Sequence, residues 1–154
     1  MTQARTRSAH EALHDFLESN GFTIESYDAP TVAIPIGPVT IPLPNSEGRK
    51  KVVRFHDLHH VATGYGTDLI GEGEIGAWEL RAGCTNFASW FYNSMAAGFG
   101  FLLSPRRVWR AFRSAKGQRT LYRLGVPYDE VLAMPIDEVR ERLGLPAGGV
   151  ANLR

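Results

Sequence analysis

The chain has 154 residues, 44% of them hydrophobic, and a formal net charge of +1 at pH 7. This length and composition predict a single domain over residues 1–154, long enough for a hydrophobic core. The one cysteine, Cys84, excludes an intramolecular disulfide framework and fits a reducing compartment. Because no N-terminal apolar run resembles a signal peptide, a cytoplasmic location is expected, with peripheral attachment to a membrane as a variant.

The first predicted element is an amphipathic helix that contains a peptidase-like pattern. His10-Glu11-Ala12-Leu13-His14 matches the H-E-x-x-H pattern, in which two histidines bind zinc and the glutamate is the general base. Ser8 and Glu11 also form a capping box, which explains Glu11 without chemistry. The nine residues before the pattern leave no room for an upstream sheet that would hold a peptide. A zinc peptidase is therefore only the third candidate function.

Residues 31–44, TVAIPIGPVTIPLP, combine apolar residues with prolines and glycine. Proline removes the backbone donors that a helix or a central strand requires. We expect an irregular, extended and partly buried arm in which a short edge hairpin can form. A charged loop over residues 45–51 would follow it.

Three of the five histidines lie between residues 54 and 80, together with five acids. The apolar spacing of residues 55–62 allows a helix, in which each residue turns about 100°. His56, Asp57 and His60 then project within an arc of about 100°. Two imidazoles one turn apart beside a carboxylate form a typical set of metal ligands.

A turn over residues 63–67, broken by two glycines, predicts a second helix with Thr67 as its N-cap. This helix would place Asp68, Glu72, Ile75 and Glu79 on one face. A tight helix-turn-helix could bring Glu72 back over the two histidines. Two histidines and two carboxylates suit zinc, iron or manganese, with room for water or substrate.

The spacing His56-Asp57-x-x-His60, eleven residues and then Glu72 resembles the signature of the ubiquinone-biosynthesis family known as coenzyme Q protein four. Residues 56–72 match that family almost position by position, and residues 131–146 resemble its closing helix more weakly. The match covers about a quarter of the chain. This chain departs from the family by being shorter than most members and by adding His59 and Glu74 beside the motif.

The resemblance implies a largely helical, membrane-associated protein that holds a divalent metal, most readily zinc, with iron or manganese as alternatives. It implies His56, Asp57, His60 and Glu72 as ligands. It also implies an enzyme that removes a ring carboxylate from a prenylated aromatic or quinone precursor, with hydroxylation. A hydrophobic prenylated small molecule or lipid, and other biosynthetic proteins, would be the partners.

The remaining polar residues near the motif receive secondary roles. His59 points about 60° to the other side of His56, which favours a supporting or surface position over a ligand. Asp57 or Glu74 is the candidate catalytic proton acceptor. Arg81 is the candidate cofactor-binding residue that would hold an anionic group. The plain alternative is that these residues form a solvated polar face or a buried hydrogen-bond network.

Residues 85–103 are rich in aromatics but interrupted by polar residues and glycine, which favours a central core helix over a membrane span. Their small residues could line an apolar slot for an isoprenoid tail. No acid lies between Glu79 and Asp129, and residues 105–124 predict one basic helix. That helix could lie on an anionic membrane surface or form a solvated face. No recognised nucleic-acid module accompanies it, so no nucleic acid is expected.

Two short helices over residues 127–133 and 135–143, and a loose tail over 147–154, complete the predicted fold. The fold class is all-α, with the arm over residues 31–44 as its irregular part. The favoured function is a metal-dependent enzyme. The alternative is a non-catalytic lipid-binding or scaffold module with a structural metal.

Overall fold

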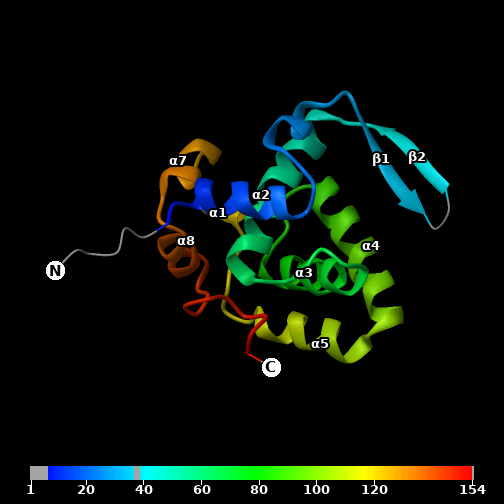
Figure 1. Cartoon of the computed structure of the whole chain (residues 1–154). Helices are drawn as coiled ribbons and strands as arrows, with labels where there is room; N and C mark the ends of the chain where they lie inside the picture. The colour runs from blue at the N-terminus through cyan, green and yellow to red at the C-terminus, as the bar shows by residue number, and fades with distance from the viewer. Residues whose placement is uncertain (1–6, 37–38, 154) are drawn as a thin grey trace.

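The structure, a computed structural model, describes residues 7–36 and 39–153, and most of these lie in helices (Figure 1). In chain order the elements are α1 (Ala9–Ser19), the 3-10 helix η1 (Ile24–Asp28), β1 (Thr31–Ile36), β2 (Val39–Pro44), α2 (Glu47–Thr63), α3 (Leu69–Ala82), α4 (Phe87–Leu103), α5 (Pro105–Ser114), α6 (Leu121–Leu124), α7 (Tyr128–Ala133) and α8 (Ile136–Leu143). The expected all-α class is therefore correct only in part, since a small sheet accompanies the helices.

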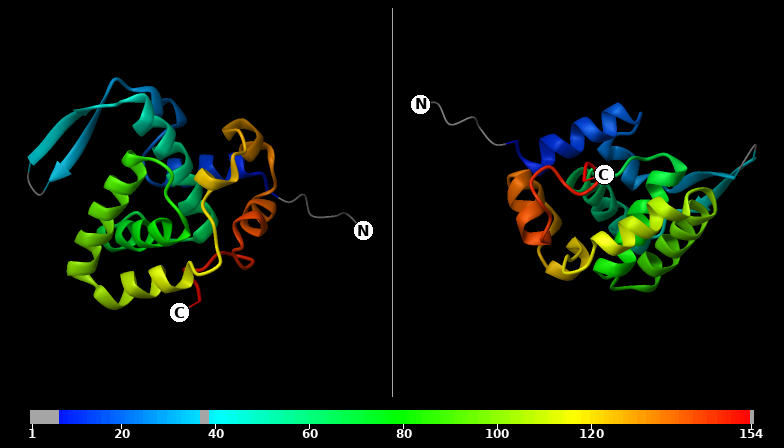
Figure 2. Two further views of the ribbon diagram at one scale, coloured as in Figure 1. Left: turned by 180° about the vertical axis from the view of Figure 1, so that it is seen from behind. Right: turned by 90° about the horizontal axis from the view of Figure 1, so that it is seen from below.

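The arm over residues 31–44 is an antiparallel hairpin in which β1 pairs with β2. Both strands are edge strands, so the paired prolines Pro35, Pro42 and Pro44 can face the unpaired side without removing a ladder bond. The hairpin extends away from the helices (Figures 1 and 2), and Val39 is 58% exposed. The expected extended arm with an edge hairpin is thus confirmed, whereas its expected irregularity and partial burial are wrong for most of the described residues.

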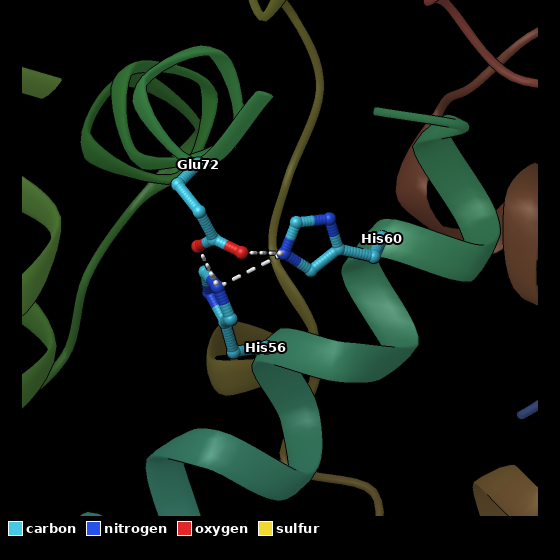
Figure 3. Close-up of side chains that lie close together, drawn as sticks. All are labelled: His56, His60 and Glu72. Carbon is cyan, nitrogen blue, oxygen red and sulfur yellow. Dashed lines mark hydrogen bonds and ion pairs between the residues drawn. The ribbon is translucent and has the colours of Figure 1, made fainter. Parts of the chain in front are cut away.

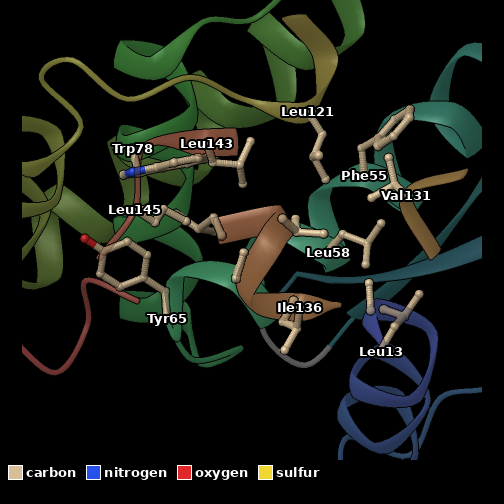
Figure 4. Packing of buried hydrophobic residues seen from close by; sticks show 14 of the residues in the cluster. Leu13, Phe55, Leu58, Tyr65, Trp78, Leu121, Val131, Ile136, Leu143 and Leu145 are labelled. Carbon is tan, nitrogen blue, oxygen red and sulfur yellow. The ribbon is translucent and has the colours of Figure 1, made fainter. Parts of the chain in front are cut away.

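The hydrophobic core lies where α1, α2, α3, α7 and α8 meet (Figure 4). Each of these helices contributes a side chain that is almost fully buried, namely Leu13, Leu58, Trp78, Val131 and Leu143. The Ser8–Glu11 capping box that begins α1 is confirmed. Removal of these apolar groups from water stabilises the arrangement that positions α2 against α3.

Helix α2 is longer than the apolar spacing predicted. It begins at Glu47, with the Ser46 hydroxyl accepting a hydrogen bond from the Arg49 amide, so residues 47–51 are helical and not a loop. It ends where Gly64 adopts a left-handed conformation, φ 83°, which glycine reaches without steric cost. The predicted turn after residue 63 is confirmed.

The expectation that residues 85–103 form a central core helix is wrong. Helix α4 lies along the outer edge of the molecule, with α3 on its inner side (Figures 1 and 2). A Cβ atom added to Gly100 would lie 2.5 Å from the Cα of Gly73, so the two helices pack backbone against backbone. Ala96 and Gly100 therefore contact α3, whereas Gly98 is exposed, so the small residues of α4 do not together line a slot for an isoprenoid tail. Phe87 and Leu102 are 82% and 80% exposed on the opposite side.

The single basic helix expected over residues 105–124 is divided into α5 and α6. Gly117, at φ 81°, turns the chain after α5. The Thr120 hydroxyl then donates to the carbonyl of Gly83, and the Leu121 amide donates to Nε2 of His59 at 2.8 Å. The helix ends early because these tertiary bonds draw residues 118–122 against α2 and α3.

Helices α7 and α8 form where the sequence predicts them, and Gly144 ends α8 at φ 74°. The tail is not loose in its middle, because the amides of Val150 and Ala151 both donate to the Thr63 carbonyl at the end of α2, at 2.9 and 3.0 Å. Within the described residues, no helix combines the length and the apolar character needed to cross a membrane.

Candidate metal centre

Helix α2 presents His56 and His60 to the same side, one turn apart (Figure 3). Their Nε2 atoms lie 3.1 Å from each other. The rings meet edge to face, with centroids 4.7 Å apart. The His60 side chain is 1% exposed and that of His56 is 18% exposed, so both imidazoles are largely shielded from water.

Glu72 reaches this pair from α3, as the predicted helix-turn-helix requires. Its two carboxylate oxygens lie 3.3 Å from Nε2 of His56 and 3.3 Å from Nε2 of His60. Asp68, and not the expected Thr67, caps α3 by accepting a hydrogen bond from the Gly71 amide. Within the described chain, His56, His60 and Glu72 form one group of ligand atoms that all lie within 4.8 Å of one another.

The Nδ1 atoms of both rings already have hydrogen-bond partners, which leaves the Nε2 atoms as the possible metal ligands. Nδ1 of His60 lies 3.0 Å from the carbonyl oxygen of Tyr65, and Nδ1 of His56 lies 2.8 Å from Oε1 of Glu79. A carbonyl or a carboxylate only accepts, so each Nδ1 donates its hydrogen. The Nε2 atoms of both rings therefore face each other and the Glu72 carboxylate, an arrangement that either a proton or a metal ion between them can satisfy.

Glu79 is the residue that joins the two sides of the site, although the sequence indicated only that it shares a helix face with Glu72. It is fully buried and accepts hydrogen bonds from His56, His59 and Asn93 at 2.8, 2.7 and 2.5 Å, and from the Tyr122 hydroxyl at 2.9 Å. Burial alone would raise the pKa of Glu79. His56 and His59 have the larger opposite effect, so the pKa is lowered well below its ordinary value and the carboxylate stays ionised. The available signal was the position of Glu79, an acid two turns beyond Glu72 on the same helix face and flanked by apolar residues on both sides.

His59 lies in the supporting layer and not at the surface. Its Nδ1 bonds to Glu79 and its Nε2 accepts from the Leu121 amide, so both ring nitrogens have partners. Burial lowers its pKa, which favours the neutral ring that accepts this amide. His59 is therefore not available as a ligand.

The remaining electrostatics also favour a cation at the centre. Burial raises the pKa of Glu72, but hydrogen bonds with His56 and His60 lower it to about 2. Burial lowers the pKa of His56, yet Glu79 and Glu72 together raise it well above its ordinary value. Two ionised carboxylates around two imidazoles thus attract either a proton or a metal ion.

Asp57, which the resemblance implied as a ligand, lies beside this group but outside it. Its Oδ2 accepts a hydrogen bond from the Tyr27 hydroxyl at 2.5 Å. Burial raises the pKa of Asp57, although His56 and Tyr27 oppose the shift. The carboxyl is thus placed to exchange a proton rather than to complete a ligand set.

Two other predicted residues lie elsewhere. Glu74 is buried on a different side of α3, where Arg107 holds it in a two-point ion pair at 2.7 and 3.0 Å. Arg81 is exposed, and its guanidinium lies 5.1 Å from the ring centre of Phe112. Neither belongs to the centre, because a regular helix turns these positions away from Glu72.

The N-terminal peptidase pattern does not assemble as such. His14 lies near Asp15 and Glu18, and all three are exposed, whereas His10 is absent from that group in the described structure. Glu11 serves the capping box with Ser8. The geometry therefore offers no support for the peptidase alternative.

A cavity of about 610 Å³ opens beside the centre and reaches both Asp57 and Glu72. Phe16 and Val53 are among its apolar walls, and Lys50 lies at its edge. Phe16 also stacks on His60, with ring centres 5.5 Å apart. The centre thus borders a mainly apolar space with a cation at one side.

Comparison with protein-family models, with curated proteins and with solved structures gives no match. The family resemblance described above therefore rests on the sequence motif alone.

Proposed function

We propose that this protein is a metal-dependent enzyme that holds one divalent metal, most readily zinc, through His56, His60 and Glu72. The convergence of two histidine Nε2 atoms on one carboxylate supports this proposal. Catalytic zinc sites use three protein ligands and keep a further position open, and two histidines with one carboxylate also suit ferrous iron. When bound, such a metal supplies a Lewis acid that polarises a substrate oxygen.

The substrate class follows from the cavity at the centre. Its apolar walls suit an aromatic or quinone-like ring with a prenyl substituent, while Arg49 and Lys50 on its lining can hold an anionic group. These two cations take the role expected of Arg81. The cavity volume of about 610 Å³ is within the range of small-molecule sites.

The reaction class comes from the motif resemblance and is part of the proposal: loss of a carboxylate from the ring as carbon dioxide. The ring carbon that loses the carboxylate must gain a proton. Asp57 faces the cavity with a raised pKa and is our candidate for the donor, with Tyr27 holding its carboxyl in place.

Elemental mass spectrometry on four purified proteins tests the centre. We expect near-stoichiometric metal in the wild type, in the Asp57→Asn variant and in the matched control His10→Ala, and none in His60→Ala. Metal retained by His60→Ala but lost from His10→Ala would instead favour the N-terminal pattern. Absence of metal from all four after supplementation would reduce the cluster to a protonated hydrogen-bond network.

A second measurement separates the enzyme from a scaffold with a structural metal. Azide added to the cobalt-substituted protein should shift the visible absorption bands, because an open coordination position binds it. A closed structural site would leave the spectrum unchanged. Carbon dioxide release from a prenylated hydroxybenzoic acid, lost in Asp57→Asn without loss of metal, would then support the reaction class.

A further inference from the structure

The outer side of α4 and the adjoining part of α5 expose an unusual amount of apolar surface. Nine of the fourteen large hydrophobic side chains that are exposed in the described structure lie on these two helices. Single exposed apolar residues are normal on soluble proteins, but a contiguous patch marks an interaction site. Neither the metal centre nor its cavity uses this surface.

Five of these side chains form one stripe along α4, which we call the α4 face and define by Phe87, Trp90, Phe91, Met95 and Leu102. At about 100° per residue they project within an arc of about 140°. The stripe follows the 17 residues of α4, a length of about 25 Å. Gly73 of α3 packs against the other side of the helix, so the stripe has no partner within the described chain.

The segment that forms α4 and α5 carries charge of one sign. No acid lies between Glu79 and Asp129. Arg106, Arg110 and Arg113 are exposed on α5, next to the exposed ring of Trp109. In Figure 1, α5 follows α4 after a sharp turn, and Arg106, the second residue of α5, therefore lies near the end of the apolar stripe.

We propose that the α4 face, with the arginines of α5, docks on the surface of an anionic lipid bilayer. A helix with apolar and aromatic side chains on one face and cations at its border lies in the membrane interface, with the apolar side inserted among the acyl chains. Tryptophan rings prefer the headgroup level. Exposed arginines add attraction to anionic headgroups.

The same observations disfavour a second copy of the chain as the occupant. In a two-fold dimer this surface would meet itself. The arginines of the two copies would then approach one another with no acid of the α4–α5 segment to pair with them, a like-charge contact that costs binding energy. An anionic bilayer satisfies both the apolar stripe and its basic border.

Vesicle flotation with the full-length protein tests the proposal. We expect binding to vesicles of phosphatidylcholine mixed with phosphatidylglycerol, and weaker binding to phosphatidylcholine alone or in high salt. Trp90→Gln combined with Leu102→Gln should weaken binding about tenfold or more, from the lost apolar insertion. Arg106→Glu and Arg110→Glu should each weaken it about fivefold or more.

Two matched controls show whether the effect belongs to this surface. Phe22→Gln replaces an apolar side chain that is 57% exposed at the end of α1, and Arg142→Glu reverses an exposed charge on α8. Both should bind vesicles as the wild type does. Circular dichroism of each variant confirms that it is folded.

Tryptophan fluorescence gives an independent readout. Trp78 is fully buried, whereas Trp90 and Trp109 are 50% and 55% exposed. Anionic vesicles should therefore shift the emission to the blue through the two exposed indoles. Absence of both flotation and shift would overturn the proposal. So would equal losses in Phe22→Gln and Trp90→Gln, or a concentration-dependent dimer that Leu102→Gln abolishes in the absence of any vesicle binding.

Discussion

Two regions depart from the usual pattern of apolar side chains inside and polar side chains outside. The α2–α3 pair buries polar groups, whereas helix α4 exposes apolar ones. On α2 and α3, three of the fully buried side chains are polar, namely His59, His60 and Glu79. On α4, large apolar side chains such as Phe87 and Leu102 face solvent. A buried polar group is tolerated only when it is hydrogen-bonded, and an exposed apolar stripe only when it has a use outside the fold. The buried polar groups of the first region find hydrogen-bond partners within the chain. The exposed apolar side chains of the second region require a partner from outside it.

The largest expected effect comes from removing the carboxylate that satisfies the buried polar network. Glu79→Ala leaves His56, His59 and Tyr122 without their shared acceptor. Loss of one member of a buried charged network costs about 3–5 kcal/mol in the free energy of unfolding. Urea denaturation of the metal-free protein measures this.

Glu72→Ala is the matched control on the same helix. Its side chain is 36% exposed, so we expect a loss of about 1 kcal/mol or less. Equal losses in the two variants would mean that the Glu79 network does not hold α2 against α3.

A milder change at the same position should affect the metal more than the fold. Glu79→Gln keeps the shape of the side chain but offers a weaker acceptor to Nδ1 of His56. Loss of such an outer partner lowers metal affinity about 10- to 100-fold. Zinc titration against a chromophoric chelator measures the affinity, and Glu74→Gln, which changes an acid paired with Arg107 outside the centre, should leave it unaltered.

The close crossing of α3 and α4 predicts the next effect. A Cβ atom at Gly100 would lie 2.5 Å from the Cα of Gly73. Gly100→Ala must therefore push the helices apart, at a cost of about 1–3 kcal/mol. Thermal or urea unfolding measures the loss.

At Gly98, two residues before Gly100, the same substitution should stabilise the protein. No atom lies within 4 Å of a Cβ added there, so Gly98→Ala should stabilise the protein by about 0.5–1 kcal/mol through helix propensity. If Gly100→Ala were as favourable as Gly98→Ala, the assigned inner side of α4 would be wrong.

These two regions also differ in how far the sequence could predict them. His56 and His60 are one turn apart on one helix, and a short glycine turn leads to Glu72, so local geometry brought the three together. Glu79 accepts hydrogen bonds from residues on α2, α4 and α6. Such long-range partners cannot be read from helical spacing, and its role was therefore missed.

The predicted burial of helix α4 was wrong for a different physical reason. Aromatic side chains usually mark the buried side of a helix. In α4 the small residues make the tertiary contact, because Gly73 and Gly76 of α3 allow a close backbone approach. Helical periodicity predicted the helix itself and could not show which of its sides α3 covers. The division of residues 105–124 has a similar cause, since the bond from the Leu121 amide to His59 is tertiary.

The smallest expected effect on the free energy of unfolding comes from the exposed apolar side chains of α4. Trp90→Gln and Leu102→Gln remove exposed apolar groups in favour of a good helix former, so each should change the free energy of unfolding by no more than about 0.5 kcal/mol. Leu143→Ala, at a fully buried position, should cost about 2–5 kcal/mol in the same urea measurement. A large loss in Leu102→Gln would show that the stripe is covered within the fold. A negligible loss, together with weaker vesicle binding, means that these side chains serve contact with lipid, because folding then gains nothing from them.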